Sequence, residues 1–180
     1  MKCDEVLYYA YLDGDDEALE ELLIRYCESL TLFLVTIVKN IDDAEDLMMD
    51  AFSVLLSSEK TFCGRSCFKT WLFAIGRNKA VSFIRKDHKK REKFVEAYHL
   101  TETKSTESLL LQKERNVTLY NAFKMLKEEY RKVLYLSFFE EMSHADIGII
   151  MDKTPKQIAD LLYNGKKTLR KVLSIEEYTL

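Results

Sequence analysis

Residues 42–91 read DDAEDLMMDAFSVLLSSEKTFCGRSCFKTWLFAIGRNKAVSFIRKDHKKR. An acidic segment with apolar residues at helical spacing is followed directly by a segment rich in aromatic and basic residues. Residues 1–59 hold 15 Asp and Glu against 3 Lys and Arg, whereas residues 60–93 hold 11 basic residues against 2 acidic ones. Such separation of charge indicates different partners for neighbouring helices: a basic protein groove for the first and nucleic acid for the second. A solvated surface of mixed charge is the alternative.

The composition favours long helices. The chain has 180 residues, of which 47% are hydrophobic, with only five Gly and one Pro. So few helix breakers favour an all-α fold, as one larger domain or two small ones. No apolar run approaches the roughly 20 residues that span a bilayer. The first residues also lack the order of regions found in a secretory signal, so we expect a cytoplasmic protein without membrane insertion.

The four cysteines do not form a recognisable metal site. Cys63 and Cys67 are four residues apart, but a zinc site needs two more ligands at suitable spacing, and the three histidines are scattered. In a cytoplasmic protein the cysteines are expected to be reduced. Cys27 lies among apolar residues and is expected to pack as one of them. We therefore expect no metal and no other cofactor.

The first part of the chain predicts four helices: residues 5–12, residues 15–39 after a break at Gly14, a third from Asp42, and a fourth from Phe68 into the basic tail. Glu45 lies three residues after Asp42, as in a capping box. Trp71 shares helical spacing with Phe68 and Ile75, which favours a core position over stacking on a base. The polar stretch that follows predicts a linker. The expected domains are 1–91 and 108–180, joined by a flexible linker at 92–107.

The second domain predicts helices at residues 109–125 and 128–139, followed by a compact pair. Ser143 caps the first of the pair, with Asp146 at the third position. Thr154 caps the second, with Pro155 at the first helical position and Gln157 at the third. A tight turn at residues 151–153 makes this pair a helix-turn-helix, which can read the major groove of DNA. The alternative is a helical hairpin without a nucleic-acid role.

Three segments together resemble bacterial RNA polymerase sigma factors of the extracytoplasmic-function (ECF) group. DAEDLMMDAF, at residues 43–52, resembles the acidic helix that docks on the polymerase clamp. GRSCFKTWLFAIGRNKAVSFIRK, at 64–86, resembles the segment that melts and reads the minus-ten promoter element. LKEEYRKVLYLSFFEEMSHADIGIIMDKTPKQIADLLYNGKKTLRKVL, at 126–173, resembles region 4, which reads the minus-thirty-five element. The likeness covers roughly residues 5–91 and 108–173.

The resemblance implies an alternative sigma factor rather than an enzyme. Its partners would be core RNA polymerase, at the clamp and flap regions, promoter DNA and an anti-sigma factor, with no small-molecule substrate. The implied fold is a region 2-like four-helix bundle and a region 4-like helix-turn-helix domain. The implied polymerase-binding residues are Asp46, Leu47, Met49 and Asp50.

The resemblance also implies two sets of DNA-binding residues. For the minus-ten element these are Lys60, Arg65, Ser66, Lys69, Arg77, Asn78, Lys79, Arg85 and Lys86. For the minus-thirty-five element they are Arg131, Ser143, Thr154, Lys156, Gln157, Asp160 and Lys167. The loop at residues 60–66 lies where the family captures an unpaired base, which needs stacking and hydrogen bonds.

Some positions depart from the family pattern. Lys127 stands where members often have Pro, and Ala159, Leu161 and Asn164 stand where they have basic residues. Asp160 adds a negative charge near the expected DNA face, so contact with the upstream element is expected to be weak or unusual in sequence preference.

Two rival interpretations remain open at this point. One is a helix-turn-helix regulator that acts without docking on polymerase, although no dimer surface or half-site spacing is evident. The other is a helical adaptor that binds only protein. The acids near residue 43 could also serve only to complement the dipole of their own helix. Because the first half is acidic, the isolated chain is expected to bind promoters poorly and its polymerase complex to bind them well.

Overall fold

The computed structural model of the chain describes residues 2–56, 62–94 and 122–177, and all regular structure within these ranges is helical. The chain divides into two compact units, Met1–Thr103 and Lys104–Leu180. Each unit is a separate helical domain, as the sequence predicts. None of the described helices combines the length and the apolar character needed to cross a bilayer.

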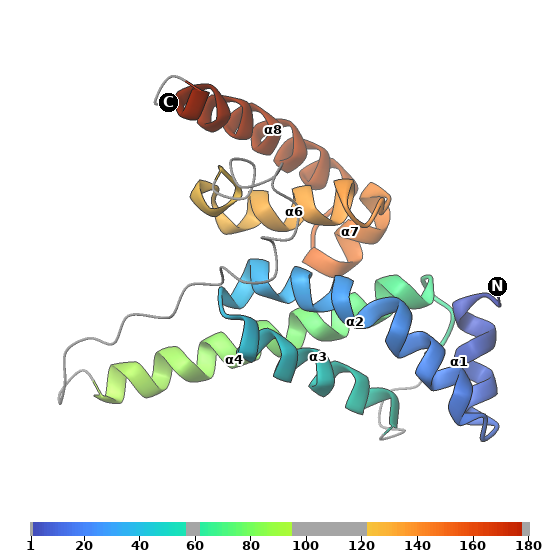
Figure 1. The fold of residues 1–180 in the computed structure, drawn as a ribbon. Helices are drawn as coiled ribbons and strands as arrows, with labels where there is room; N and C mark the ends of the chain where they lie inside the picture. Colours follow the sequence, from blue (N-terminus) through green and yellow to red (C-terminus); the bar gives the residue numbers. More distant parts are fainter. Residues whose placement is uncertain (1, 57–61, 95–121, 178–180) are drawn as a thin grey trace. The chain divides into compact units, whose positions relative to one another are not determined.

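The first unit contains helices α1 (Asp4–Leu12), α2 (Asp16–Val38), α3 (Ile41–Leu56) and α4 (Phe68–Phe94) (Figure 1). Helix α2 is central, since it packs against each of the other three. The Asp15 carboxylate caps it by accepting from the Ala18 N–H at 3.3 Å. Its apolar stripe is buried with apolar residues of α3 and α4, and this core includes Leu22, Leu30, Phe33, Leu34, Ala51, Leu55, Leu72 and Phe73.

The start of α3 differs from the prediction. Asn40, rather than Asp42, caps this helix, because Asn40 Oδ1 accepts from the N–H groups of Asp42 at 2.8 Å and of Asp43 at 3.2 Å. The predicted capping box of Asp42 and Glu45 is therefore wrong. The residue before the cap, Lys39, takes a left-handed backbone (φ 62°), which turns the chain sharply between α2 and α3.

The fourth helix runs from Phe68 into the basic tail, as predicted. Helix α4 continues through Phe94, past the expected domain end at residue 91. Its last turns contain Lys, Arg and Glu and no Gly or Pro, so local propensity favours a continued helix. The remainder of the predicted linker lies outside the described residues.

The second unit contains a helical turn at residues 122–125, then α6 (Glu128–Phe138), α7 (His144–Met151) and α8 (Pro155–Glu177) (Figure 1). Helix α8 packs against both α6 and α7. Apolar side chains from all three form the core, among them Val133, Leu134, Leu136, Ile147, Ile150, Ile158 and Leu162. The predicted helix at 109–125 lies largely outside the described residues.

The helix-turn-helix is confirmed in its local detail. Ser143 Oγ accepts from the Asp146 N–H at 3.2 Å. Thr154 Oγ1 accepts from the Gln157 N–H at 3.3 Å, and Gln157 Oε1 accepts from the Thr154 N–H at 2.8 Å, which completes the capping box. The turn brings the Lys153 carbonyl so near α7 that a Cβ at Gly148 would lie 2.6 Å from that oxygen. Glycine is therefore required for this close approach.

Candidate functional site

The exposed face of α3 carries two carboxylates and a thioether. Asp46 and Asp50 are exposed one turn apart, and the Met49 side chain beside them is 59% exposed. Leu47 is different, since only 5% of it is exposed and it packs in the core. Its side chain therefore supports the helix from behind, and a contact of Leu47 with a partner stays a prediction. The face available to a partner consists of Asp46, Met49 and Asp50, here called the α3 face.

The N-terminal end of α3 concentrates negative charge. Burial raises the pKa of Asp43, and the nearby carboxylates of Asp87, Asp42 and Asp46 raise it further. Asp87 belongs to α4, so one carboxylate of this largely basic helix adds to the negative charge around Asp43. A cationic partner surface would relieve this repulsion, which makes this end of the bundle a favourable place for a basic protein and an unfavourable one for phosphates.

Residues 62–67, here called the loop, are the described part of the segment between the acidic helix and the basic one. Phe62 is buried, while Cys63, Gly64, Arg65 and Cys67 are exposed. Gly64 has φ 68°, a left-handed conformation that glycine adopts without strain. Ser66 Oγ donates to the Cys67 carbonyl at 3.3 Å. The predicted base-capture residues Arg65 and Ser66 therefore share one short bend, whereas Lys60 lies outside the described residues.

The predicted DNA-binding residues of α4 do not form one face. Asn78 and Arg85 are seven residues apart and so share one side, while Lys79 and Lys86 share another. Arg77 Nη1 donates to Asn78 Oδ1 at 3.3 Å. On the second of these sides, Lys79 Nζ lies 3.9 Å from Asp50 Oδ2 of the α3 face. Lys69 lies near the start of the helix, with its ammonium 5.9 Å from the centre of the Phe73 ring.

Trp71 lies in an aromatic cluster beneath the loop. Its ring centre is 5.7 Å from Tyr8, 5.5 Å from Phe62 and 5.7 Å from Phe68. The side chain is half-buried. These contacts agree with the expectation that Trp71 serves the core, and they give the loop an aromatic base on which to rest.

The outer face of α8 is largely polar. Lys156, Asp160, Tyr163 and Lys167 are exposed at spacings of three and four, so they line one side of the helix. Tyr163 is 69% exposed and was not predicted as a site residue, although its spacing from Lys156 signals the shared face. Gln157 uses its amide oxygen in the cap, as described above. This row, here called the α8 face, follows the turn of the helix-turn-helix.

Three residues predicted to contact DNA have internal roles in the second unit. Arg131 is half-buried, and its Nη1 donates to the Lys124 carbonyl at 3.2 Å. Burial lowers the pKa of Arg131, and its Nε is buried without a hydrogen-bond partner. Ser143 and Thr154 are exposed but serve as helix caps. The two caps account for Ser143 and Thr154 without any DNA role, whereas the hydrogen bond from Arg131 Nη1 does not account for the buried Nε of that residue.

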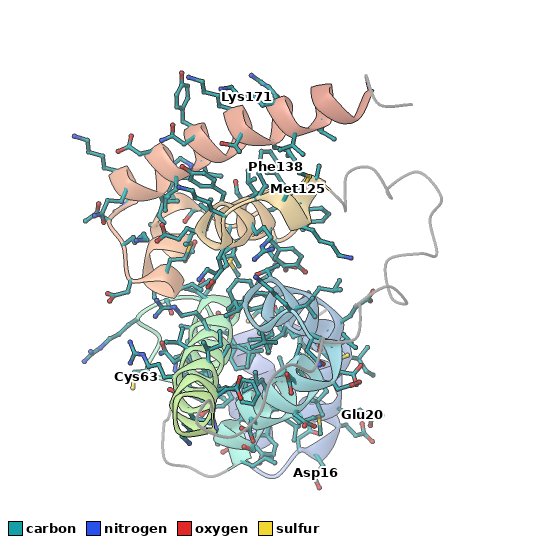
Figure 2. The ribbon with its side chains drawn as sticks, turned by 90° about the vertical axis from the view of Figure 1, so that its left-hand side faces the viewer. Asp16, Glu20, Cys63, Met125, Phe138 and Lys171 are labelled. Atoms are coloured by element: carbon teal, nitrogen blue, oxygen red, sulfur yellow. The ribbon has the colours of Figure 1, made fainter. Side chains whose placement is uncertain are left out.

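Metal chemistry finds no support among the described residues. No group of three or more His, Cys, Asp or Glu side chains in the described ranges is arranged to hold an ion. Cys67 Sγ instead lies 3.0 Å from Thr70 Oγ1. In Figure 2 the Cys63 side chain points outward from the first unit.

Two family models match the chain in sequence order. One, described as Sigma-70 region 2, matches residues 17–91, and the other, described as Sigma-70 region 4, matches residues 117–169. The first includes the α3 face, the loop and α4, and the second includes the helix-turn-helix. Together the two models account for more than half of the chain.

Curated relatives match over nearly the whole length. The ECF RNA polymerase sigma factor SigX of Bacillus subtilis is 27% identical over 166 residues, which cover 89% of this chain and 86% of SigX. The ECF RNA polymerase sigma-E factor of Escherichia coli K12 is 23% identical over 176 residues, with 92% of each chain covered.

Solved structures share the fold. The sigma factor RpoE of Bartonella quintana, in complex with the anti-sigma factor NepR, superposes with a TM-score of 0.68 at 23% identity. The match covers 87% of this chain and 96% of RpoE. CnrH, in complex with the cytosolic domain of CnrY, gives a TM-score of 0.67 at 18% identity and covers 97% of this chain and 99% of CnrH.

Proposed function

Because the chain belongs to the sigma-70 family of RNA polymerase sigma factors, we propose that it is an alternative sigma factor that directs promoter-specific initiation. The observation that carries this proposal is the presence of regions 2 and 4 in one chain, in that order, with an acidic exposed helix beside a basic one. The protein lends specificity to a catalytic partner, and no reaction is assigned to its own residues. Its place of action is the cytoplasm, where core RNA polymerase works.

The α3 face docks on the polymerase clamp. Asp46 and Asp50 supply charge for a basic surface, and Met49 supplies a flexible apolar contact between them. Leu47 holds the helix against the core, so that the three exposed side chains keep their relative positions.

The loop and α4 melt the promoter. Arg65 and Ser66 hold an unpaired base, and the cations of α4 contact phosphates on either side of the separated strands. The two-sided distribution of these cations suits two diverging strands better than one straight duplex. Because α3 repels DNA, melting requires the polymerase to cover the acidic face first.

The α8 face recognises the upstream promoter element. Lys156 and Lys167 contact phosphates, while Tyr163 and Gln157 reach base edges in the major groove. Asp160 lies in the same row and opposes phosphate, so this contact contributes less affinity than the melted region. The second unit also exposes Met125, Phe138 and Phe139, a surface suited to an apolar segment such as the polymerase flap (Figure 2 labels Met125 and Phe138).

An anti-sigma factor is the regulatory partner. It silences the protein by covering surfaces that polymerase needs, the α3 face among them. The support is that RpoE, which shares the fold, was solved in complex with the anti-sigma factor NepR, and that CnrH was solved in complex with the cytosolic domain of CnrY.

The function is tested by incubating the purified chain with core RNA polymerase and a genomic promoter library, followed by sequencing of the transcripts. We expect a discrete set of new start sites that require the chain. A dimer that binds palindromic DNA without polymerase would instead support the regulator. The protein-only adaptor would be supported if polymerase binding depended on Asp50 while substitution of Arg77 or Lys156 left transcription unchanged.

A further inference from the structure

A carboxylate of helix α1 hydrogen-bonds to the start of α4. Glu5 Oε1 accepts from the Phe68 N–H at 3.1 Å, although the two residues are 63 positions apart. This N–H belongs to the first residue of α4 and has no partner within the helix. A carboxylate at that end is also favoured by the helix dipole. The residue before the helix, Cys67, has no side-chain oxygen that could cap it, and its thiol contacts Thr70.

A second contact from α1 holds the other end of the loop. The Tyr8 hydroxyl accepts from the Phe62 N–H at 3.3 Å in a buried hydrogen bond. Tyr8 is 1% exposed, and its ring centre lies 5.9 Å from Phe62 and 5.5 Å from Phe68. One turn of α1 thus contacts both residues that bound the loop.

The residues between these two anchors are the exposed ones. Arg65 and Ser66 lie in the bend between Phe62 and Phe68, and only five residues separate the anchored positions. A short segment fixed at both ends has few conformations left to lose when it binds a ligand. Helix α1 is itself held to α2, because Asp4 Oδ1 and Arg25 Nη1 form an ion pair at 2.6 Å and Tyr26 donates to the same carboxylate.

We propose that Glu5 and Tyr8 are positioning residues for base capture: they fix the loop at residues 62–67 so that an unpaired promoter base meets a preformed site. The proposal rests on the proposed function. It assigns α1 a role in promoter opening that is separate from docking, because neither residue belongs to the α3 face.

The test uses holoenzyme and fork-junction DNA made from a promoter that the wild-type chain transcribes. Abasic sites are placed one at a time along the melted strand. The abasic position that weakens wild-type binding most marks the captured base. Base capture is measured by the ratio of the holoenzyme's affinities for intact DNA and for DNA that is abasic at that position. A general loss of protein stability would lower both affinities alike and leave this ratio unchanged.

Three variants separate the contributions. Tyr8→Phe removes only the hydroxyl, Glu5→Ala removes the carboxylate, and Glu5→Gln retains a neutral acceptor for the Phe68 N–H. We expect Tyr8→Phe and Glu5→Ala to reduce the intact-to-abasic ratio roughly threefold to tenfold, the loss of one hydrogen bond. Glu5→Gln should restore part of it. Polymerase affinity should stay within about twofold of wild type, since the α3 face is intact.

Tyr9→Phe is the matched control, because Tyr9 is the next residue and is 47% exposed. It should leave the ratio unchanged. Unchanged discrimination in both Tyr8→Phe and Glu5→Ala would overturn the proposal, as would an equal loss of polymerase affinity in both. A wild-type holoenzyme that fails to distinguish intact from abasic DNA at every position would instead contradict the proposed function in melting.

Discussion

Lys79 Nζ of α4 lies 3.9 Å from Asp50 Oδ2 of α3. The ion pair joins the helix proposed to dock on polymerase to the helix proposed to contact DNA. Both side chains remain partly exposed, so the pair contributes at most about 1 kcal/mol to stability. Its importance is positional: the two functions meet at this contact, yet each residue can be changed without unfolding the bundle.

Changing the two residues of this pair should separate docking from melting. We expect Asp50→Ala to weaken binding to core polymerase by about tenfold, the size of one charged interfacial contact. Lys79→Ala should leave that affinity within about twofold and should lower open-complex formation instead. Fluorescence anisotropy with labelled chain measures the first effect, and permanganate footprinting of the melted strands measures the second.

Glu20→Ala is the charge-matched control, because Glu20 is an exposed acid that belongs to α2 rather than to α3 (Figure 2). It should change neither quantity. Equal losses of polymerase binding in Asp50→Ala and Glu20→Ala would show that only net charge matters, and the assignment of the α3 face would be wrong.

Upstream binding should respond to salt through Lys156. Removing one phosphate contact lowers the slope of log affinity against log salt concentration by about 1. We expect this change for Lys156→Ala in holoenzyme, measured on duplex DNA that carries only the upstream element. Asp160→Ala should strengthen binding, since it removes repulsion from the same face.

Lys166→Ala provides the comparison within α8. The Lys166 ammonium lies 4.9 Å from the centre of the Phe138 ring on α6 and does not belong to the α8 face. Its substitution should leave the salt slope unchanged. An equal change of slope for Lys156→Ala and Lys166→Ala would argue against a defined DNA-contacting row.

The turn of the helix-turn-helix should not tolerate a side chain at Gly148. A Cβ there would lie 2.6 Å from the Lys153 carbonyl, which is backbone and cannot rotate away. We expect Gly148→Ala to destabilise the second unit by about 1–3 kcal/mol. Urea unfolding followed by far-UV circular dichroism measures the loss, while fluorescence of the single tryptophan, Trp71, reports on the first unit.

Gly165→Ala is the control for this substitution, because its Cβ would approach the Leu134 side chain no closer than 3.4 Å. Alanine also favours the helix over glycine by roughly 0.5–1 kcal/mol. This variant should be neutral or stabilising. A Gly148→Ala variant as stable as Gly165→Ala would show that the close approach in the turn is relaxed at little cost.

The capping role of Glu5 should make the first unit sensitive to acid. Hydrogen bonds from its own backbone N–H and from the Phe68 N–H lower the pKa of Glu5, and partial burial opposes them. A carboxyl whose pKa is lowered on folding stabilises the protein above the unfolded value, here 4.5, and loses that contribution as pH falls through the folded value.

Glu5→Gln isolates this contribution, because it removes the ionisable carboxyl and retains a neutral acceptor for the Phe68 N–H. At neutral pH we expect wild type to be more stable than Glu5→Gln by about 1 kcal/mol or less, because Glu5 is partly exposed. The difference should shrink towards zero in acid. Trp71 fluorescence during urea unfolding at several pH values measures it, and a difference that grows on acidification would contradict the cap.

Local signals in the sequence predicted the local structure well. The caps at Ser143 and Thr154 were predicted correctly because the interacting residues lie three positions apart. The cap at Asn40 was missed because Asp42 and Glu45 offered the same pattern two residues later. Leu47 was grouped with its exposed neighbours because the family resemblance gives positions in the sequence but not the burial of each side chain.

The contacts that hold the loop had no local signal at all. Glu5 meets Phe68 and Tyr8 meets Phe62 only after α1 has packed against α4, and both pairs are more than fifty residues apart in sequence. The spread of Asn78, Lys79 and their neighbours around α4 could in principle be read from helical periodicity. That the side with Lys79 lies next to Asp50 of α3 required the structure, because it depends on how the two helices pack.

Transcription with defined components tests the central claim most directly. Core RNA polymerase is supplied with wild-type chain or with the Asp46→Lys/Asp50→Lys double variant, on a template that carries a promoter found in the library. The account predicts a run-off transcript with wild type and none with the variant, although circular dichroism shows both folded. A wild-type chain that is folded yet neither binds core polymerase nor yields any transcript would contradict it.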